Sequence, residues 1–176
     1  MSTTKDGERP ADSAVAGDTE GLSHLDADGK ARMVEVGTKP ATQREAVATG
    51  RVCMAPETLR ALLAGQTPKG DVFAVARVAG IQAAKRTADL IPLCHTIALT
   101  GCDVRFEPEP PQRLRIEARV RAQDRTGVEM EALTAVAVAG LTIYDMLKAI
   151  DRDMVLEEVC LLEKHGGRRG SYQRGA

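Results

Sequence analysis

The stretch RLRIEARVRAQ, residues 113–123, carries the plainest strand pattern in the chain. Apolar and charged residues alternate along it, and successive side chains of a strand point to opposite faces of a sheet. One face would carry Leu114, Ile116, Ala118 and Val120, and the other Arg113, Arg115, Glu117, Arg119 and Arg121. The pattern predicts a strand that buries one face and turns its arginines outward, to solvent or to a second subunit.

Strand and helix signals alternate on both sides of this stretch. Asp71 is placed to cap a long helix that ends before Pro92, and Pro56 and Gly65 would begin and end a shorter helix. The other predicted elements are strands at residues 46–54 (with Gly50 as a bulge), 97–109 and 154–164, and a second long helix at residues 129–150. Residues 32–36 would add a short strand or an arm.

The order of the main elements is β, α, β, β, α, β, which is the ferredoxin-like arrangement. We therefore expect an α+β fold with an antiparallel sheet and two long helices on one face. Residues 1–28 are polar, acidic and rich in Gly and Ser, which predicts a disordered tail. One folded domain would follow at residues 29–170, and a flexible C-terminus at residues 171–176.

The composition disfavours several classes of partner. The 24 Lys and Arg balance 25 Asp and Glu, so the net charge of -1 gives no global attraction to nucleic acid or to an anionic membrane. RNA binding on such a sheet normally uses stacking aromatics, and aromatic residues make up only 2% of the chain. We also expect no signal peptide, and no apolar run approaches the length of a membrane span.

The four cysteines, Cys53, Cys94, Cys102 and Cys160, lack the paired spacing of a structural zinc site. We expect reduced, mostly buried thiols in a cytoplasmic protein, and no metal site.

Both long helices are apolar on more than one face. In the first, the apolar residues that surround much of the axis are Val72, Phe73, Val75, Ala76, Val78, Ala79, Ala83 and Ala84. A sheet covers only one side of such a helix, so a second subunit is the simplest cover for the other side.

Polar residues interrupt the apolar helix at residues 129–150. At about 100° per residue, they fall within an arc of about 120°. They are Glu131, Thr134, Thr142, Asp145 and Lys148. The arc suits either a solvent-facing stripe with an Asp145–Lys148 pair or the wall of a polar pocket.

Glu129 and the basic residues at the ends of elements have competing interpretations. Thr126 and Glu129 match a helix capping box, whereas Glu129 and Glu131 would share one face if the EME run is still extended. Lys69 and Lys164 are either ordinary surface residues or half of a charged site. His95 follows the helix end at Pro92 and lacks partner ligands for a metal, which leaves a buried core histidine or a substrate contact.

Three segments together resemble the cyclic pyranopterin monophosphate synthase family, the molybdenum cofactor biosynthesis protein C family. They are KGDVFAVARVAGIQAAKRTADLIPLCH (69–95), TGVEMEALTAVAVAGLTIYDMLKAI (126–150) and MVLEEVCLLEKHGG (154–167). The likeness runs from about Met33 to Gly170, and its motifs are long and unusual.

The resemblance implies a ferredoxin-like enzyme that assembles as a homohexamer, a trimer of dimers, with active sites at a subunit interface. The implied reaction converts (8S)-3′,8-cyclo-7,8-dihydroguanosine 5′-triphosphate into cyclic pyranopterin monophosphate and pyrophosphate, a phosphorus–oxygen lyase step of molybdopterin biosynthesis. It requires no cofactor, although a divalent metal such as Mg²⁺ would suit a triphosphate. A binding module that holds a nucleotide without chemistry is the rival class, and release of pyrophosphate distinguishes the two.

The resemblance also assigns roles to residues. The catalytic acid falls on Asp145, and the other catalytic positions are Lys148, Lys164 and Lys69. The substrate-binding positions are Leu93, Cys94, His95, Glu129, Met130, Glu131 and Arg44. The chain departs from the family at Thr96, Leu147 and His165, where Pro, Cys and Ser are usual.

The residue types fit that chemistry. Lysines and a histidine can neutralise a triphosphate and the leaving pyrophosphate, and a carboxyl beside a lysine suits transfer of protons on and off a ring. Which group is the acid and which the base at each step stays open.

Overall fold

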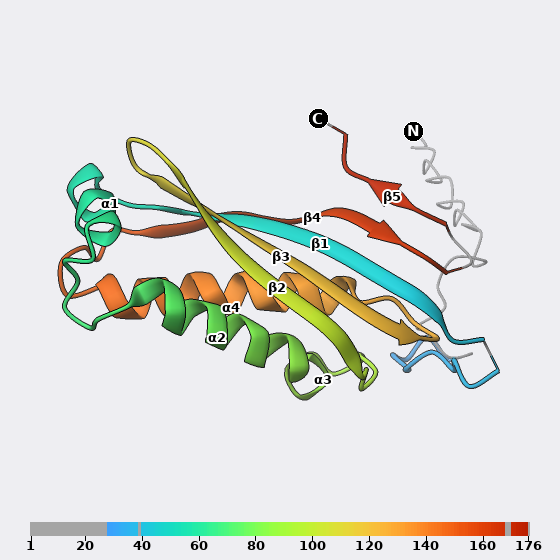
Figure 1. Cartoon of the computed structure of the whole chain (residues 1–176). Coiled ribbons are helices and arrows are strands. Elements are labelled where there is room, and N and C mark those ends of the chain that lie inside the picture. Colours follow the sequence, from blue (N-terminus) through green and yellow to red (C-terminus); the bar gives the residue numbers. More distant parts are fainter. Residues whose placement is uncertain (1–27, 39, 168–169, 176) are drawn as a thin grey trace, which may run out of the picture. The chain divides into compact units, whose positions relative to one another are not determined.

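The computed structural model describes residues 28–38, 40–167 and 170–175. Contacts within the chain separate the segment that ends at Val34 from the unit Glu35–Ala176, which holds every helix and strand of the described residues (Figure 1). The predicted tail at residues 1–28 lies, except for Asp28, outside the described part. Its disorder and the domain bounds therefore stay predictions. Residues 32–36 form neither helix nor strand.

Five strands form one sheet in the order β2-β3-β1-β4-β5, and every neighbouring pair is antiparallel. The strands are β1 (Thr42–Cys53), β2 (Leu99–Glu109), β3 (Arg113–Asp124), β4 (Val155–His165) and β5 (Tyr172–Gln173). The order of the first four strands confirms the ferredoxin-like prediction. The two-residue β5 pairs with the end of β4 and was not predicted. The pairing of β1 with β4 shifts register twice, and each time the extra residue lies on β4. One shift falls opposite Gly50, which itself stays in register with β3, so the bulge predicted at Gly50 lies on the partner strand instead.

Strand β3 has the two faces that its sequence predicts. Its four apolar residues are fully buried in the core. Its arginines lie on the outward face, where they pair with carboxylates of β1, β2 and β4. Arg119 pairs with Glu45 and Glu163, and Arg121 pairs with Asp103. The outward face is thus a layer of partly exposed ion pairs.

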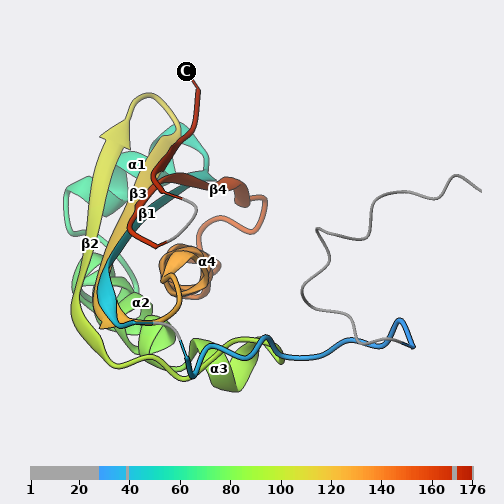
Figure 2. The same ribbon diagram turned by 90° about the vertical axis from the view of Figure 1, so that its right-hand side faces the viewer.

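Two helices, α2 (Val72–Lys85) and α4 (Glu129–Leu147), cover the same face of this sheet (Figure 2). The carboxylate of Asp71 accepts a hydrogen bond from the Ala74 N–H at 2.9 Å, which confirms the predicted cap. The two helices approach closely at Gly80, where an added Cβ would lie 3.0 Å from the carbonyl oxygen of Ala135. The shorter helix α1 (Pro56–Leu63) begins at Pro56 as predicted.

Helix α2 ends earlier than its sequence pattern predicts. The hydroxyl of buried Thr87 donates to the carbonyl oxygens of Ala83 and Ala84, at 3.2 and 3.1 Å. The break coincides with these bonds: the Arg86 N–H donates to the Ala83 carbonyl oxygen, three residues back, and the α-helix stops at Lys85. A four-residue helix α3 (Thr87–Leu90) and a loop at residues 91–98 follow.

Helix α4 lacks the capping box suggested by its sequence. Its N-cap is Val128, with no side-chain cap, because the carboxylate of Glu129 pairs instead with Lys164. The helix ends at Leu147 rather than at residue 150. By length and composition it could cross a membrane, which the sequence analysis did not expect, but more than half of it is buried and core helices pass the same test.

Each long helix keeps a second apolar face, as predicted. Val75 and Val78 of α2 are 47% and 60% exposed, and Leu141 of α4 is 59% exposed. The sheet covers the opposite faces of these helices.

Candidate active site

Three of the predicted catalytic residues meet at the C-terminal end of α4, and we call them the lysine–aspartate cluster. Asp145 is on the last turn of the helix, Lys148 is its C-cap, and Lys69 lies in the loop before α2. The Asp145 carboxylate lies 2.7 Å from Lys148 Nζ and 2.8 Å from Lys69 Nζ. Lys69 also donates to the Asp145 carbonyl oxygen at 2.9 Å, so one carboxylate and one carbonyl position both ammonium groups.

These lysines fix the protonation state of Asp145. Hydrogen bonds from Lys148 and Lys69 lower the pKa of Asp145 from 3.8 to about 2. The same contact with Asp145 raises the pKa of Lys148. In this state Asp145 is a carboxylate at neutral pH. The side chains are half exposed, so a charged substrate can reach them.

A second group of predicted residues gathers at the other end of α4, and we call it the glutamate cluster. Glu129 and Glu131 occupy the first turn of the helix, and Lys164 Nζ on β4 lies 2.7 Å from Glu129 Oε1. Met130 and Leu93, both predicted to bind substrate, have exposed side chains.

Glu131 is a buried carboxyl, with only 3% of its surface exposed. Burial, with smaller contributions from the nearby charges of Glu129 and Asp124, raises the pKa of Glu131 from 4.5 to about 7. Burial raises the pKa of the Cys94 thiol, and the negative charge of Glu131 adds to this effect. The predicted EME and LCH segments therefore lie next to each other in space.

His95 lies in the loop after α3 and is partly buried. It lines a small pocket together with Glu131, Thr87, Lys85, Arg86 and Asp89. The sequence analysis missed the last four of these residues as neighbours of His95. The signal was the charged run KRTAD directly before LIPLCH, which a helix break at Arg86 turns toward the same loop.

Arg44 lies on β1, two residues before Ala46, which is the register partner of Lys164. Both Arg44 and Lys164 therefore belong to the helix-facing side of the sheet. The Nε of Arg44 donates to the carbonyl oxygen of Asp124 at 3.0 Å. Gly167 has a φ of 85°, and a Cβ there would lie 1.9 Å from Arg44 Nη1, so the glycine lets the turn after β4 close over this arginine.

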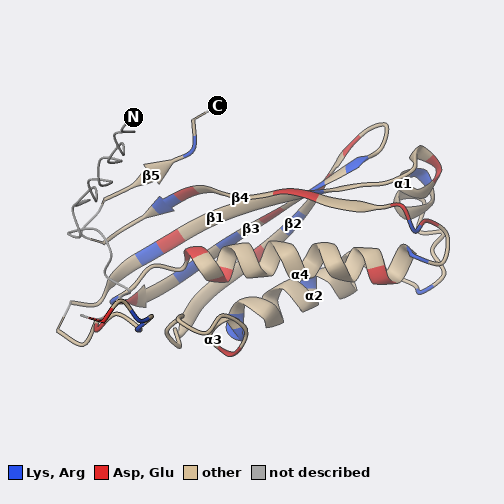
Figure 3. Ribbon diagram, turned by 180° about the vertical axis from the view of Figure 1, so that it is seen from behind, with Lys and Arg blue, Asp and Glu red and all other residues tan. Residues whose placement is uncertain are grey.

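One chain does not bring the two clusters together. Asp145 follows Glu129 on the same straight helix by sixteen residues, which is about 24 Å at a rise of about 1.5 Å per residue. Figure 3 shows charged residues near both ends of α4 and an uncharged stretch between them.

The predicted polar stripe of α4 is accordingly two different environments. Glu131 and Thr134 are buried at one end, and Asp145 and Lys148 form the predicted pair in a largely exposed setting at the other. Thr142 donates to the carbonyl oxygen of Val138 within the helix. The interpretation as a pocket wall therefore fits the end with Glu131, and the interpretation as a solvent-facing stripe fits the end with Asp145 and Lys148.

Comparison with known proteins identifies relatives over most of the chain. A cyclic pyranopterin monophosphate synthase from Pelotomaculum thermopropionicum is 63% identical over 155 residues, which cover 88% of this chain and 91% of the relative. Enzymes of the same name from Chloroflexus aurantiacus and Chloroflexus aggregans are 62% and 58% identical, over 87% and 91% of this chain and 94% and 98% of their own lengths. The sequence model of the MoaC family matches residues 33–167, so the chain belongs to the MoaC family.

Proposed function

We propose that this chain is a cyclic pyranopterin monophosphate synthase of molybdenum cofactor biosynthesis. The proposed reaction converts (8S)-3′,8-cyclo-7,8-dihydroguanosine 5′-triphosphate into cyclic pyranopterin monophosphate and pyrophosphate. The observation that carries the proposal is the 63% identity over 88% of the chain with a relative of that name. The two charged clusters supply the residue types that such a reaction needs.

The basic residues of both clusters are proposed to bind the phosphates. Closing the cyclic phosphate makes a bond from a substrate oxygen to the α-phosphorus and breaks the bond from that phosphorus to the pyrophosphate oxygen. Negative charge develops on the leaving pyrophosphate, and ammonium and guanidinium groups stabilise it. Lys69, Lys148 and Lys164 of the two clusters, together with Arg44, are proposed for this role. No resident cofactor is part of the proposal, and a Mg²⁺ ion carried by the triphosphate would belong to the substrate.

Asp145 is proposed to accept a proton rather than to donate one at the start of the reaction. The lysine contacts that hold its pKa at about 2 keep it ionised before substrate binds. Once the phosphates draw Lys69 and Lys148 away, the basicity of Asp145 rises and Lys148 can deliver a proton. Glu131, with a pKa raised to about 7, is the carboxyl best suited to carry a proton at the other end.

The active site is proposed to form between subunits of a cytoplasmic homohexamer, a trimer of dimers. Two observations support this. The clusters on one chain are about 24 Å apart, farther than one nucleotide-sized substrate spans while reacting. The exposed valines of α2 and Leu141 of α4 offer apolar surface for another subunit to cover.

The test is turnover of the cyclised dihydroguanosine triphosphate by the purified full chain. The proposed function predicts release of one pyrophosphate for each pterin product formed. Binding of the nucleotide without release of pyrophosphate would instead identify a binding module. An equal rate with GTP would contradict recognition of the cyclised substrate.

A further inference from the structure

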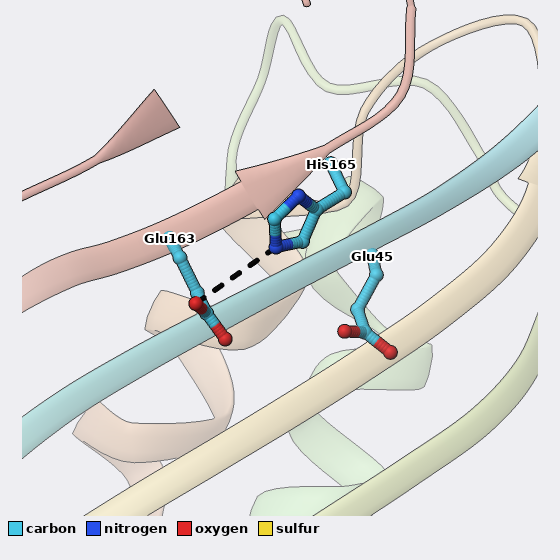
Figure 4. A group of neighbouring side chains, drawn as sticks. All are labelled: Glu45, Glu163 and His165. Carbon is cyan, nitrogen blue, oxygen red and sulfur yellow. Dashed lines mark ion pairs between the residues drawn. The ribbon is translucent and has the colours of Figure 1, made fainter. Parts of the chain in front are cut away.

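Three metal-binding side chains gather on the face of the sheet that points away from α2 and α4 (Figure 4). Glu45 comes from β1, and Glu163 and His165 come from β4. One ligand atom from each residue lies within 4.8 Å of the other two. None of the three belongs to the two clusters of the proposed active site.

The sheet register explains why these residues meet. Glu45 is the direct partner of His165 across the antiparallel pair, and partner side chains lie about 5 Å apart at Cβ. Glu163 precedes His165 by two residues and so shares its face of the strand. Three donors are thus held by a regular hydrogen-bonded backbone rather than by a loop.

Arg119 on β3 organises the two carboxylates. Its guanidinium lies 2.5 Å from Glu45 Oε1 and 3.3 Å from Glu163 Oε1. Each carboxylate keeps a second oxygen, and Glu163 Oε2 lies 3.8 Å from His165 Nε2. The competing cation at Glu45 Oε2 is Arg121, at 4.0 Å. Two arginines therefore balance much of the negative charge, which limits affinity while it fixes geometry.

Ser171 orients the imidazole. The hydroxyl of Ser171 lies 3.1 Å from His165 Nδ1, which leaves Nε2 directed toward Glu163. Histidines that bind metals usually engage their second ring nitrogen in this way, and the partner fixes the ring and its tautomer. His165 is half exposed, so an ion can reach it from solvent.

We propose that Glu45, Glu163 and His165 form a binding site for a divalent transition-metal ion, best suited to zinc. One imidazole and two carboxylates are ligands that zinc accepts, with water completing the coordination. Magnesium and calcium prefer sets made only of oxygen and gain little from the imidazole. The bound ion would join β1 to β4 directly beside Lys164, whose side chain points to the opposite face. This site is independent of the proposed reaction.

The experiment is calorimetric titration of the full chain with zinc alone, followed by the same titration with magnesium alone. Wild-type protein should bind one zinc ion per chain at this site. His165→Ala and Glu163→Gln should each weaken zinc binding at least about tenfold, since loss of even an outer partner costs that much. Glu117→Gln is the matched control, because it removes a partly exposed carboxylate from the same sheet face outside the trio. It should change the affinity less than about twofold.

Thermal unfolding of each variant shows whether a loss of zinc binding comes from a loss of folding. Each variant should have the wild-type thermal midpoint without zinc, and zinc should raise the midpoint of wild type and Glu117→Gln only. Wild-type zinc affinity in His165→Ala and Glu163→Gln would overturn the proposal and point to a site such as Cys94 and His95. Absence of zinc binding, or equally tight binding of magnesium, would overturn it as well.

Discussion

Asp145 joins two of the predicted catalytic lysines, so its carboxylate both positions them and balances their charge. Asp145→Asn keeps the size of the side chain but removes the ionisable group. We expect turnover to fall about 100-fold or more, the usual contribution of a general acid or base. Substrate binding should largely survive because the lysines still hold the phosphates. Single-turnover pterin formation and direct substrate binding measure the two effects separately.

The control for this prediction is Asp153→Asn. Asp153 is an exposed aspartate in the turn that follows α4, and it lies outside both clusters. Its replacement should leave turnover unchanged. Wild-type turnover in Asp145→Asn would refute the proposed role, however similar the relatives are.

Glu131 predicts a pH dependence of stability. Its pKa is raised from 4.5 to about 7 in the folded protein, so the folded state holds this proton more tightly than the unfolded chain does. The stabilisation is complete below about pH 4.5, is lost as the pH rises to about 7, and stays lost above that. Glu131→Gln cannot ionise. Its stability relative to wild type should therefore increase from about pH 5 to about pH 8, by at most about 3 kcal/mol.

Urea denaturation at the two pH values, at one protein concentration, measures this difference. Glu117→Gln, on the outward face of β3, should show no such change between the two conditions. Parallel pH profiles for Glu131→Gln and wild type would mean that the carboxyl is solvated in the assembled protein.

At the scale of elements, the sequence could predict whatever depends on periodicity. The alternation of β3, the cap at Asp71 and the pairing of Asp145 with Lys148 are local patterns, and the structure has all three. The end of α2 was predicted wrongly because no proline or glycine marks it. The break instead coincides with buried Thr87, whose hydroxyl contacts the carbonyl oxygens of Ala83 and Ala84.

The candidate site also contains features that could be predicted from the sequence and features that could not. Residue types and positions could be predicted from the resemblance, but the partner of Glu129 could not. A capping box is a local hydrogen bond, whereas Lys164 reaches Glu129 only because β4 lies beside the start of α4. The trio of Glu45, Glu163 and His165 likewise depends on the register of β1 against β4, which a single sequence does not specify.

The packing of α2 on α4 depends on the missing side chain of Gly80. Gly80→Val would place methyl groups against the Ala135 carbonyl oxygen and Val104, both of which are buried. We expect a loss of about 1–3 kcal/mol, the usual cost of overpacking a core. Gln82→Val puts the same side chain on an exposed position of the same helix, where the change should stay within about 0.5 kcal/mol. Chemical denaturation of both variants tests this, and equal losses would mean that valine disfavours the helix itself.

At the scale of the whole molecule, the two clusters that are proposed to serve one reaction lie at opposite ends of one helix. A 19-residue helix holds them about 24 Å apart, and no hinge interrupts it. The two clusters can be close together if the lysine–aspartate cluster of one subunit faces the glutamate cluster of another. The second apolar faces of α2 and α4 make such an assembly energetically reasonable, because association would bury them.

A shared site predicts that two inactive variants restore each other. Asp145→Asn damages one cluster and Lys164→Ala the other, so each variant alone should have little activity. In mixed assemblies, some sites receive an intact Asp145 from one subunit and an intact Lys164 from its neighbour. With equal amounts and random assembly, about a quarter of the sites should be intact, and activity should recover to about that fraction of wild type.

The measurement is pyrophosphate release after the two variants are denatured together and refolded. Light scattering must give a mass several-fold above the 18.8 kDa chain for each preparation. Mixing without joint refolding is the control, since intact homo-oligomers cannot exchange clusters. Activity that never exceeds the mean of the two parents would place both clusters of each site on one chain and rule out the shared arrangement.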